Sequence, residues 1–263
     1  MSEQWVPDGI DLSRPNAARM YDYLLGGAHN FDPDRQYAER LLAMAPEVRE
    51  IAGANRAFLR RAVTWLVTNG VDQFLDLGSG IPTVGNVHEV AHRLDPACRV
   101  VYVDTEPVAV THARQLLADE PRVAALQADL RDPASVLAAP EVTGTLDLSR
   151  PVAVLLVSVL HFVPDEQRPA DLVGAYLAGT VPGSYLAISH VTRNEHTDEV
   201  RSLYRQTSDR LYPRDRAEIA ALLGGYPLVP PGLVRLPDWH PDGSVDPAAS
   251  DRSASYAAVA AHR

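Results

Sequence analysis

Short apolar runs alternate along most of this chain with longer stretches in which apolar residues recur every three or four positions. The longer stretches predict amphipathic helices, and the short runs predict strands buried on both faces of a parallel sheet. Helical patterns lie at 83–94, 107–118, 165–177 and 195–211. The seven expected strands lie at 73–77, 99–104, 123–129, 151–159, 183–191, 232–236 and 255–261. This order predicts an α/β fold with a Rossmann-like, doubly wound and mainly parallel sheet of seven strands.

The part of the chain before Gly70 has only helical patterns, at 13–25, at 33–42 and at about 55–69. In the first of these, Ser13 is in position to cap the helix and Pro15 falls in its first turn. Gly26 follows the last apolar residue and is expected to end the helix. We therefore expect an N-terminal helical cap over residues 1–50, joined in one structural unit to an α/β domain over residues 51–263.

Composition limits the partners of the protein. The formal net charge is −10, and arginine supplies all 24 positive charges because the chain has no lysine. Such a surface repels a phosphate backbone, so we expect no nucleic acid partner. The start of the chain does not resemble a signal peptide, and no stretch approaches the roughly 20 apolar residues that span a bilayer. We expect a cytoplasmic protein with no membrane partner, and the sequence does not indicate its oligomeric state.

Glycines and carboxylates follow the first three predicted strands, where the ligand crevice of an open parallel sheet lies. The glycines let the backbone approach a ligand closely. Asp104, which comes 26 positions after Gly78, is placed to accept both hydroxyls of a ribose. The alternatives are an ordinary tight turn at the glycines and helix capping by Asp104 or Asp129. The residues that follow the three strands are Asp76, Gly78, Ser79 and Gly80, then Asp104 and Thr105, then Asp129 and Leu130.

The same residues distinguish between two possible cofactors. A dinucleotide fingerprint needs a third glycine at the position of Thr83, and a chain without lysine has no Tyr-x-x-x-Lys pair, so an NAD oxidoreductase is disfavoured. S-adenosylmethionine (SAM) has no phosphate but carries an ammonium group, for which Asp76 offers a carboxylate beside the glycines. Asp129 is in position to bind the adenine amino group, and Leu130 to pack against the ring. The residues favour SAM.

Six segments carry a resemblance to a known family. They are RMYDYLLGGAHNF (19–31), QFLDLGSGIPTVGNVHEVA (73–91), VVYVDTEP (100–107), DLRDP (129–133), AVLLVSVLHFVPD (153–165) and GSYLAISHVT (183–192). On these residues the chain resembles class I SAM-dependent methyltransferases, and more narrowly a bacterial S-adenosyl methyltransferase group long listed as a domain of unknown function. The resemblance spans nearly the whole chain. It implies that the cofactor is lined by Gly78, Ser79, Gly80, Asp104, Asp129 and Leu130.

The resemblance also implies that Ser158 to His161 lie beside the methionine end of the cofactor and that residues 21–31 fold over the site as a lid. His161 is the candidate catalytic base, because it follows a long apolar strand and is expected to reach the crevice with a pKa near the working pH. The alternative is a histidine that packs against the cofactor or hydrogen-bonds to it without moving protons. Tyr21 and Asn30 are expected to close the cofactor pocket from the lid.

Several kinds of chemistry are disfavoured. The fourth strand lacks the Asn/Asp-Pro-Pro-aromatic loop that amino-methylating enzymes use. Cys98, the only cysteine, starts a strand far from the crevice, so a covalent cytosine mechanism has no nucleophile. His88 and His92 stand at i and i+4, but we expect them on a solvent-facing helix surface and predict no metal site.

The sequence predicts SAM-dependent methyl transfer to a small-molecule acceptor by in-line displacement, with S-adenosylhomocysteine (SAH) as product. The alternative is a protein that binds SAM or SAH without catalysing transfer, because a fold does not imply activity. Both alternatives use the same cofactor-binding residues. They differ in whether the lid leaves a second cavity beside the sulfonium.

Overall fold

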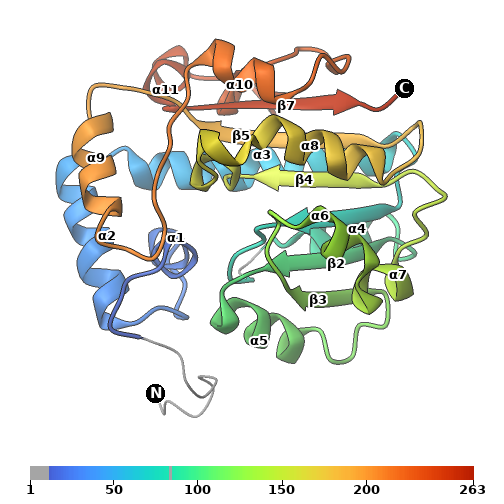
Figure 1. Ribbon diagram of the computed structural model, residues 1–263. Coiled ribbons are helices and arrows are strands. Elements are labelled where there is room, and N and C mark those ends of the chain that lie inside the picture. The colour runs from blue at the N-terminus through green and yellow to red at the C-terminus, as the bar shows by residue number, and fades with distance from the viewer. Residues whose placement is uncertain (1–11, 83–84) are drawn as a thin grey trace.

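A seven-stranded sheet runs through the centre of the molecule (Figure 1). The computed structural model describes residues 12–82 and 85–263. Strand order is β3-β2-β1-β4-β5-β7-β6; β1 to β5 are parallel, and β7 is antiparallel to both of its neighbours. The predicted fold class is confirmed. The strands are β1 (Gln73–Leu77), β2 (Arg99–Asp104), β3 (Val123–Gln127), β4 (Ala153–Val157), β5 (Tyr185–Val191), β6 (Val234–Arg235) and β7 (Ser255–Ala261).

Helices cover both faces of this sheet, and single 3₁₀ turns lie at Leu160–Phe162, Asp165–Gln167 and Leu236–Asp238. No described helix is long and apolar enough to cross a membrane. The helices are α1 (Ala17–Leu24), α2 (Asp32–Met44), α3 (Val48–Thr68), α4 (Val87–Leu94), α5 (Pro107–Leu116), α6 (Pro133–Ala138), α7 (Pro140–Thr145), α8 (Pro169–Ala178), α9 (Thr197–Tyr204), α10 (Arg216–Leu222) and α11 (Pro247–Arg252).

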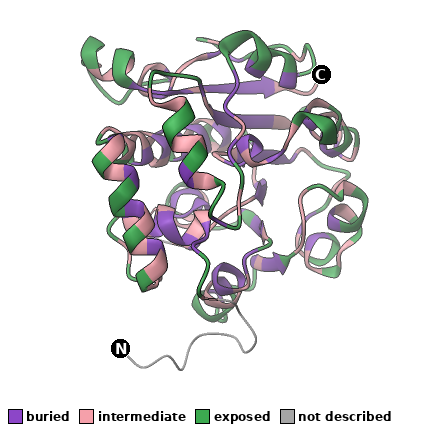
Figure 2. Cartoon of the chain, turned by 60° about the vertical axis from the view of Figure 1, so that its left-hand side comes forward, coloured by how far each residue is buried: buried purple, intermediate pink, exposed green. Residues whose placement is uncertain are grey.

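The two faces of the sheet form separate cores because successive strand residues point to opposite sides. Phe74 of β1 packs in the cluster that includes α3, α4 and α5. Its neighbour Leu75 packs in the cluster that includes α6, α7, α8 and α10. Both side chains are fully buried, and burying each stabilises the fold by about 1.5–3 kcal/mol. Figure 2 shows the strands buried beneath these layers.

Several helix boundaries differ from the sequence prediction for local reasons. Asn16, not Ser13, caps α1, because its extended backbone lets Oδ1 accept hydrogen bonds from the N–H groups of Ala18 at 2.9 Å and Arg19 at 3.3 Å. The predicted helix over 165–177 is divided at Arg168, which adopts a left-handed φ of 49°. Pro169 explains the division, since a proline disfavours the helical conformation of the residue before it.

The helix predicted over 195–211 ends at Tyr204, and residues 205–215 continue as a loop across the front of the molecule (Figure 1). Contacts with α1 hold this loop out of a helix. The Ser208 N–H donates to the Pro15 carbonyl at 3.0 Å. The Asp209 carboxylate accepts the Ala17 N–H at 3.0 Å and the Asn16 side-chain amide at 3.1 Å.

The cap is built from two distant parts of the chain. Helices α1 and α2, which lie within the predicted cap over 1–50, pack on α9 and on the start of α3. Helix α3 continues from the cap to the sheet without a break and contributes buried residues to both. The buried residues shared by these helices are Met20, Leu24, Ala38, Leu41, Ala52 and Leu203.

A buried ion cluster ties the cap to the sheet domain. Arg19 of α1 is 2% exposed, and its guanidinium contacts Asp34 of α2 at 3.0 Å and Glu106, at the start of α5, at 3.1 Å. Asp34 is fully buried and also accepts the backbone N–H groups of Asn16 and Phe31. Burial raises the pKa of Glu106, and Arg19 acts against that rise. Arg19 therefore neutralises two carboxylates that have little access to water.

We expect Arg19→Met to destabilise the protein by about 3–5 kcal/mol at neutral pH, because it leaves two buried carboxylates without their cation. The loss should shrink as the pH falls, because burial raises the pKa of Glu106 and the variant lacks the cation that opposes this rise. Urea unfolding at pH 7.5 and pH 5 measures both effects. Arg60→Met is the matched control, since Arg60 pairs with Asp242 at the surface, and such pairs contribute about 0–1 kcal/mol. An equal loss in the two variants would contradict the role given to Arg19.

Candidate active site

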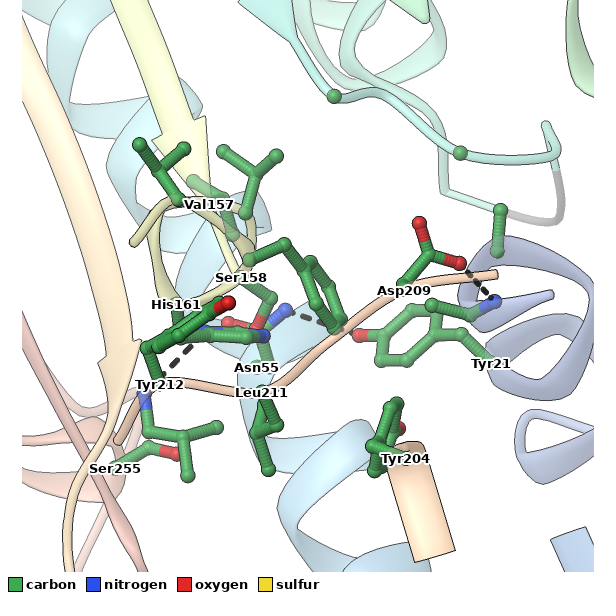
Figure 3. A pocket seen from close by; sticks show the side chains of 18 of the residues that line it. Tyr21, Asn55, Val157, Ser158, His161, Tyr204, Asp209, Leu211, Tyr212 and Ser255 are labelled. Carbon is green, nitrogen blue, oxygen red and sulfur yellow. Dashed lines mark hydrogen bonds between the residues drawn. The ribbon is translucent and has the colours of Figure 1, made fainter. Parts of the chain in front are cut away.

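A cavity of about 580 Å³ lies where the carboxyl ends of β1, β2, β3 and β4 meet the cap (Figure 3). Its volume is within the range of roughly 300–1,000 Å³ that small-molecule sites occupy. It extends from the glycine loop after β1 to the inner side of α1, α2, α3 and α9. The sequence-predicted residues that line it are Tyr21, Asp76, Gly78, Ser79, Gly80, Asp104, Thr105, Asp129, Leu130, Ser158 and His161.

The glycine loop is held close to β2. Gly78 has a φ of +71°, and a Cβ there would lie 2.2 Å from Cγ2 of Val159, so only glycine fits. The N–H groups of Gly78 and Ser79 both donate to the Val103 carbonyl. The loop therefore presents backbone, and not side chain, to the cavity.

Asp104 joins this loop to the loop after β2. Its carboxylate accepts the Gly80 N–H at 2.7 Å and the Glu106 N–H at 2.9 Å. Burial raises the pKa of this carboxyl, and these backbone hydrogen bonds oppose the rise. The lone pairs that remain free are available to two neighbouring hydroxyls of a ligand.

Asp129 lies after β3 beside Leu130 and is paired with Arg131. The Arg131 Nε contacts both Asp129 oxygens at 2.8 Å, and this hydrogen bond lowers the pKa of Asp129. The capping role considered for Asp129 belongs to Asp132, which accepts the Ser135 N–H at the start of α6. Asp129 is thus a charged carboxylate in the cavity wall.

Asp76 is the carboxylate with the fewest partners in the cavity. It is 6% exposed, and among the described residues none donates a hydrogen bond to it. Burial raises its pKa to about 7, while the charge of Arg56 on α3 acts to lower the pKa and Asp104 acts to raise it. A buried carboxylate that lines a cavity without a hydrogen-bond donor is suited to a cationic ligand.

A hydrogen-bond chain connects the cap with the turn after β4. Ser158 has a φ of +57°, and its N–H donates to the Ser189 hydroxyl at 2.9 Å. The Ser189 hydroxyl donates to Oδ1 of Asn55 at 2.6 Å, and the Asn55 amide donates to the Tyr21 hydroxyl at 2.9 Å. Figure 3 shows Tyr21 and Asn55 meeting in the pocket. Tyr21 is therefore linked to the turn after β4 through Asn55 and Ser189.

His161 lies in the wall of the cavity and is 4% exposed. Its Nδ1 accepts the Val191 N–H at 3.5 Å. The prediction of an ordinary histidine pKa is wrong, because burial, His190 and Arg214 together lower the pKa of His161 well below the usual value. His161 is a neutral imidazole in this structure.

The structure places Asn30 away from the cavity, contrary to the predicted pocket-closing role. Its amide donates to the Asp22 carboxylate at 2.8 Å and to the Gly27 carbonyl at 2.9 Å. Asp22 also accepts the His29 N–H at 2.8 Å, so these groups fix the turn that follows α1. The side chain of Asn30 stabilises the turn that follows α1 and is not among those that line the cavity.

Among the residues of the cavity wall that the sequence analysis did not single out are three with polar side chains that the site uses: Asn55, Arg56 and Asp209. The first two lie on α3, which was predicted as an ordinary covering helix. Asp209 lies on the loop that was predicted as helix. No local pattern identified them, because each reaches the cavity only through the packing of the cap.

His88 was expected at the surface and is instead buried. Its Nδ1 lies 2.7 Å from the Tyr102 hydroxyl, and burial lowers its pKa. His88 is therefore part of the packing of α4 on the sheet. Residues 12–82 and 85–263 contain no cluster of three or more His, Cys, Asp or Glu side chains that could hold a metal ion.

Comparison with known proteins agrees with this geometry. The family model described as S-adenosyl methyltransferase matches residues 3–263. The chain is similar to a proposed methyltransferase from Thermobifida fusca YX, with 39% identity, a TM-score of 0.93 and coverage of 98% of this chain and 99% of that one. It is similar to a DUF574 family protein from Streptomyces avermitilis MA-4680, with 38% identity, a TM-score of 0.90 and coverage of 96% and 99%.

A more distant structure shows the same fold. Magnesium protoporphyrin IX methyltransferase from Synechocystis PCC 6803, crystallised with bound SAH, is 16% identical, with a TM-score of 0.54 and coverage of 93% of both chains. Among the curated proteins compared, none matches.

The fold and the strand-end cavity define a SAM-dependent methyltransferase of the Rossmann-like class. The chain belongs to the S-adenosyl methyltransferase family, and its cofactor is SAM. The residues present fit this cofactor, because the glycine loop leaves backbone exposed and Asp76 offers a buried carboxylate to a cation.

We expect Asp76→Asn to stabilise the ligand-free protein by about 1–3 kcal/mol at pH 8. Because the folded-state pKa of about 7 lies above the unfolded value, ionised Asp76 costs stability, and that cost grows as the pH rises from about 4 to about 7. The gain in the variant should therefore vanish near pH 4. Thermal unfolding at several pH values measures it, with the exposed Asp119→Asn as control. A destabilised Asp76→Asn protein at pH 8 would contradict the burial argument.

Proposed function

We propose that the protein transfers a methyl group to a small-molecule acceptor inside the cavity, with SAM and acceptor side by side. The observation that carries this proposal is the extent of the cavity. Beyond the strand-end residues it continues along the cap, where apolar residues such as Leu24, Leu41 and Ile51 line it. A transferase needs such a second space for its acceptor, whereas a protein that only binds the cofactor does not.

In the proposed binding mode, Asp104 accepts the ribose hydroxyls and Asp129 lies at the adenine amino group, with Leu130 against the ring. Thr105, Ser79 and Gly80 complete the adenosine side. Asp76 faces the ammonium of the methionine end. These assignments rest on the order of the carboxylates along β1, β2 and β3, which form adjacent strands.

Arg56 extends this binding mode to the methionine carboxylate. Its charge acts directly on Asp76, and its guanidinium donates to the Gly85 carbonyl at 3.0 Å. The methionine end carries one cation and one anion, so a neighbouring carboxylate and guanidinium match it with opposite charges. Sequence inspection alone did not single out Arg56.

The cap has the role of a lid. Tyr21 and Asp209 come from α1 and from the loop after α9, and both line the cavity opposite the strand ends. Arg19 fixes α1 to the sheet domain, and hydrogen bonds of Asp209 with Asn16 and Ala17 fix the loop over 205–215 to α1, so the lid covers the site in this arrangement. Excluding water from the site favours displacement at the methyl group over side reactions.

When SAM is bound, its sulfonium supplies an electrophilic methyl group, and the chain's contribution is to align an acceptor in line with it. Ser158 and His161 lie on the turn between the cofactor side and the cap side of the cavity. A small molecule is favoured over nucleic acid because the acceptor space is enclosed by the cap and the chain carries a net charge of −10. We also propose a cytoplasmic location.

Calorimetric titration of the protein with SAM, SAH and NAD tests this function. We expect SAM and SAH to bind and NAD not to bind. Asp104→Ala should weaken SAM binding by about 1–3 kcal/mol, because it removes the partner of buried hydroxyls. The control is Asp119→Ala, which removes an exposed carboxylate from the turn that follows α5 and should leave the affinity for SAM unchanged.

Binding of NAD in place of SAM, or an Asp104→Ala variant with full SAM affinity, would contradict the proposed binding mode. Tight SAM binding with no acceptor found in a broad screen of small molecules would favour the alternative function, a sensor that binds SAM or SAH.

A further inference from the structure

We propose that His161 donates a hydrogen bond to the acceptor, and that the acceptor is a flat molecule with an acidic hydroxyl, such as a phenol or an enol, that is methylated as an oxygen anion. This inference rests on the proposed function and names its substrate class.

The first step is the position of the proton on His161. Nδ1 of the ring faces the Val191 N–H, which donates to it at 3.5 Å. A ring nitrogen that accepts a hydrogen bond carries no proton of its own, so the neutral ring carries its proton on Nε2. Among the described residues none bonds to Nε2, and the side chain lines the cavity. His161 therefore offers an N–H to a ligand.

The second step is that His161 is not suited to accept a second proton. Arg214 is buried and donates to Nε2 of His190 at 2.9 Å, and the His190 ring lies 5.4 Å from the His161 ring. Arg214 is held in place by the carbonyl groups of Leu160 and Val163 and by the Asp165 carboxylate. A positive charge on His161 would face this guanidinium in a buried site, so His161 does not serve as the base.

The third step concerns the other groups that could remove a proton. The Tyr21 hydroxyl donates to the Ala52 carbonyl and is bonded to Asn55, and burial raises the pKa of both Tyr21 and Tyr204. Asp209 accepts three hydrogen bonds, from Asn16, Ala17 and Ser208, and Figure 3 shows it across the pocket from His161.

Glu47 also lines the cavity, but at the end that lies far from Asn55. It stands eight positions before Asn55, and at 1.5 Å of rise per helical residue it lies about 12 Å from Asn55 along α3. Asp76, Asp104 and Asp129 also line the cavity, and the proposed binding mode assigns all three to the cofactor. None of the other described groups that line the space beside His161 is arranged to deprotonate an acceptor, so the acceptor must ionise without a base from the protein. An acidic hydroxyl does so.

A hydrogen-bond donor also distinguishes oxygen from nitrogen acceptors. An amine nitrogen has a single lone pair, and a donor aimed at it blocks the attack on the methyl group. An oxygen anion has three lone pairs, so it accepts the His161 N–H with one and attacks with another. A charged acceptor also makes a stronger hydrogen bond than a neutral one.

The walls of the cavity suit a flat body attached to this oxygen. The space beside His161 is lined by the aromatic rings of Tyr21, Tyr204 and Tyr212 and by the side chain of Leu211 (Figure 3). The ring of Phe162 also lines the cavity, with its centroid 4.5 Å from that of His161. Aromatic faces pack well against a planar ligand ring. The hydroxyl loses its proton to solvent on binding. The oxygen then attacks the methyl carbon, a C–O bond forms as the C–S bond breaks, and the electron pair goes to sulfur to give the neutral thioether of SAH.

The experiment uses the full-length protein saturated with SAH, with 4-nitrophenol as probe, because its anion absorbs visible light. Absorbance titrations over a range of pH give the pKa of the bound phenol. We expect that pKa to lie at least one unit below the value in free solution, which corresponds to about tenfold tighter binding of the anion. 4-Nitroaniline, which has the same shape, should bind more weakly.

Two variants test the donor. His161→Gln keeps an N–H near the position of Nε2 and should retain most of the pKa shift, whereas His161→Phe keeps a ring without a donor and should lose it. A bound pKa equal to or above the free value, no binding of 4-nitrophenol, or an unchanged shift in His161→Phe would each overturn the inference. The measurement on the unchanged protein decides the matter if His161→Phe does not fold. Absence of SAH binding by calorimetry would instead overturn the proposed function.

Discussion

The buried guanidinium of Arg19 is the contact on which the arrangement of the site depends. It neutralises Asp34 of the cap and Glu106 of the sheet domain, and so fixes α1 over the carboxyl ends of the strands. With the cap in that place, Asp76 and Asp104 are shielded from water, and burial raises the pKa of both. The protein thus holds two buried carboxylates with raised pKa values in one cavity, a common property of functional sites.

The cap also divides the cavity into two chemically different parts. The strand-end side carries carboxylates, backbone groups and Arg56, which are suited to a polar cofactor. The cap side is mainly aliphatic and aromatic, which suits an apolar acceptor. The turn that carries Ser158 and His161 lies between the two parts, and the Asn55 chain links it to Tyr21 of the cap. Contacts from both sides therefore converge at this turn, where we propose that methyl transfer takes place.

The sequence predicts the sheet well, because its signals are local. All seven strands were found, and the carboxylates after β1, β2 and β3 line one cavity, since the carboxyl ends of adjacent parallel strands share one edge. The predicted helix boundaries are wrong where tertiary contacts outweigh the local sequence pattern. Residues 205–211 were predicted as helix but are held in a loop by hydrogen bonds of Ser208 and Asp209 with Pro15, Asn16 and Ala17, and a contact so distant in sequence leaves no periodic signal.

The acceptor side was less predictable for the same reason. Asn55 and Arg56 look like ordinary residues of a covering helix, and only the position of α3 against the cap turns them to the cavity. His161 was found by its place after β4, yet its protonation depends on Arg214, which lies more than 50 positions further along the chain. Burial and distant charges decide such properties, and neither can be read from spacing.

The most direct test of this account is the number of protons released when SAH binds. Calorimetric titrations at pH 7 in buffers of different ionisation enthalpy give that number. Because Asp76 has a pKa of about 7 in the ligand-free protein and the cofactor ammonium favours its charged form, we expect release of about half a proton per SAH and none in Asp76→Asn. No release from the unchanged protein, or equal release from both, would show that Asp76 does not face the bound cation.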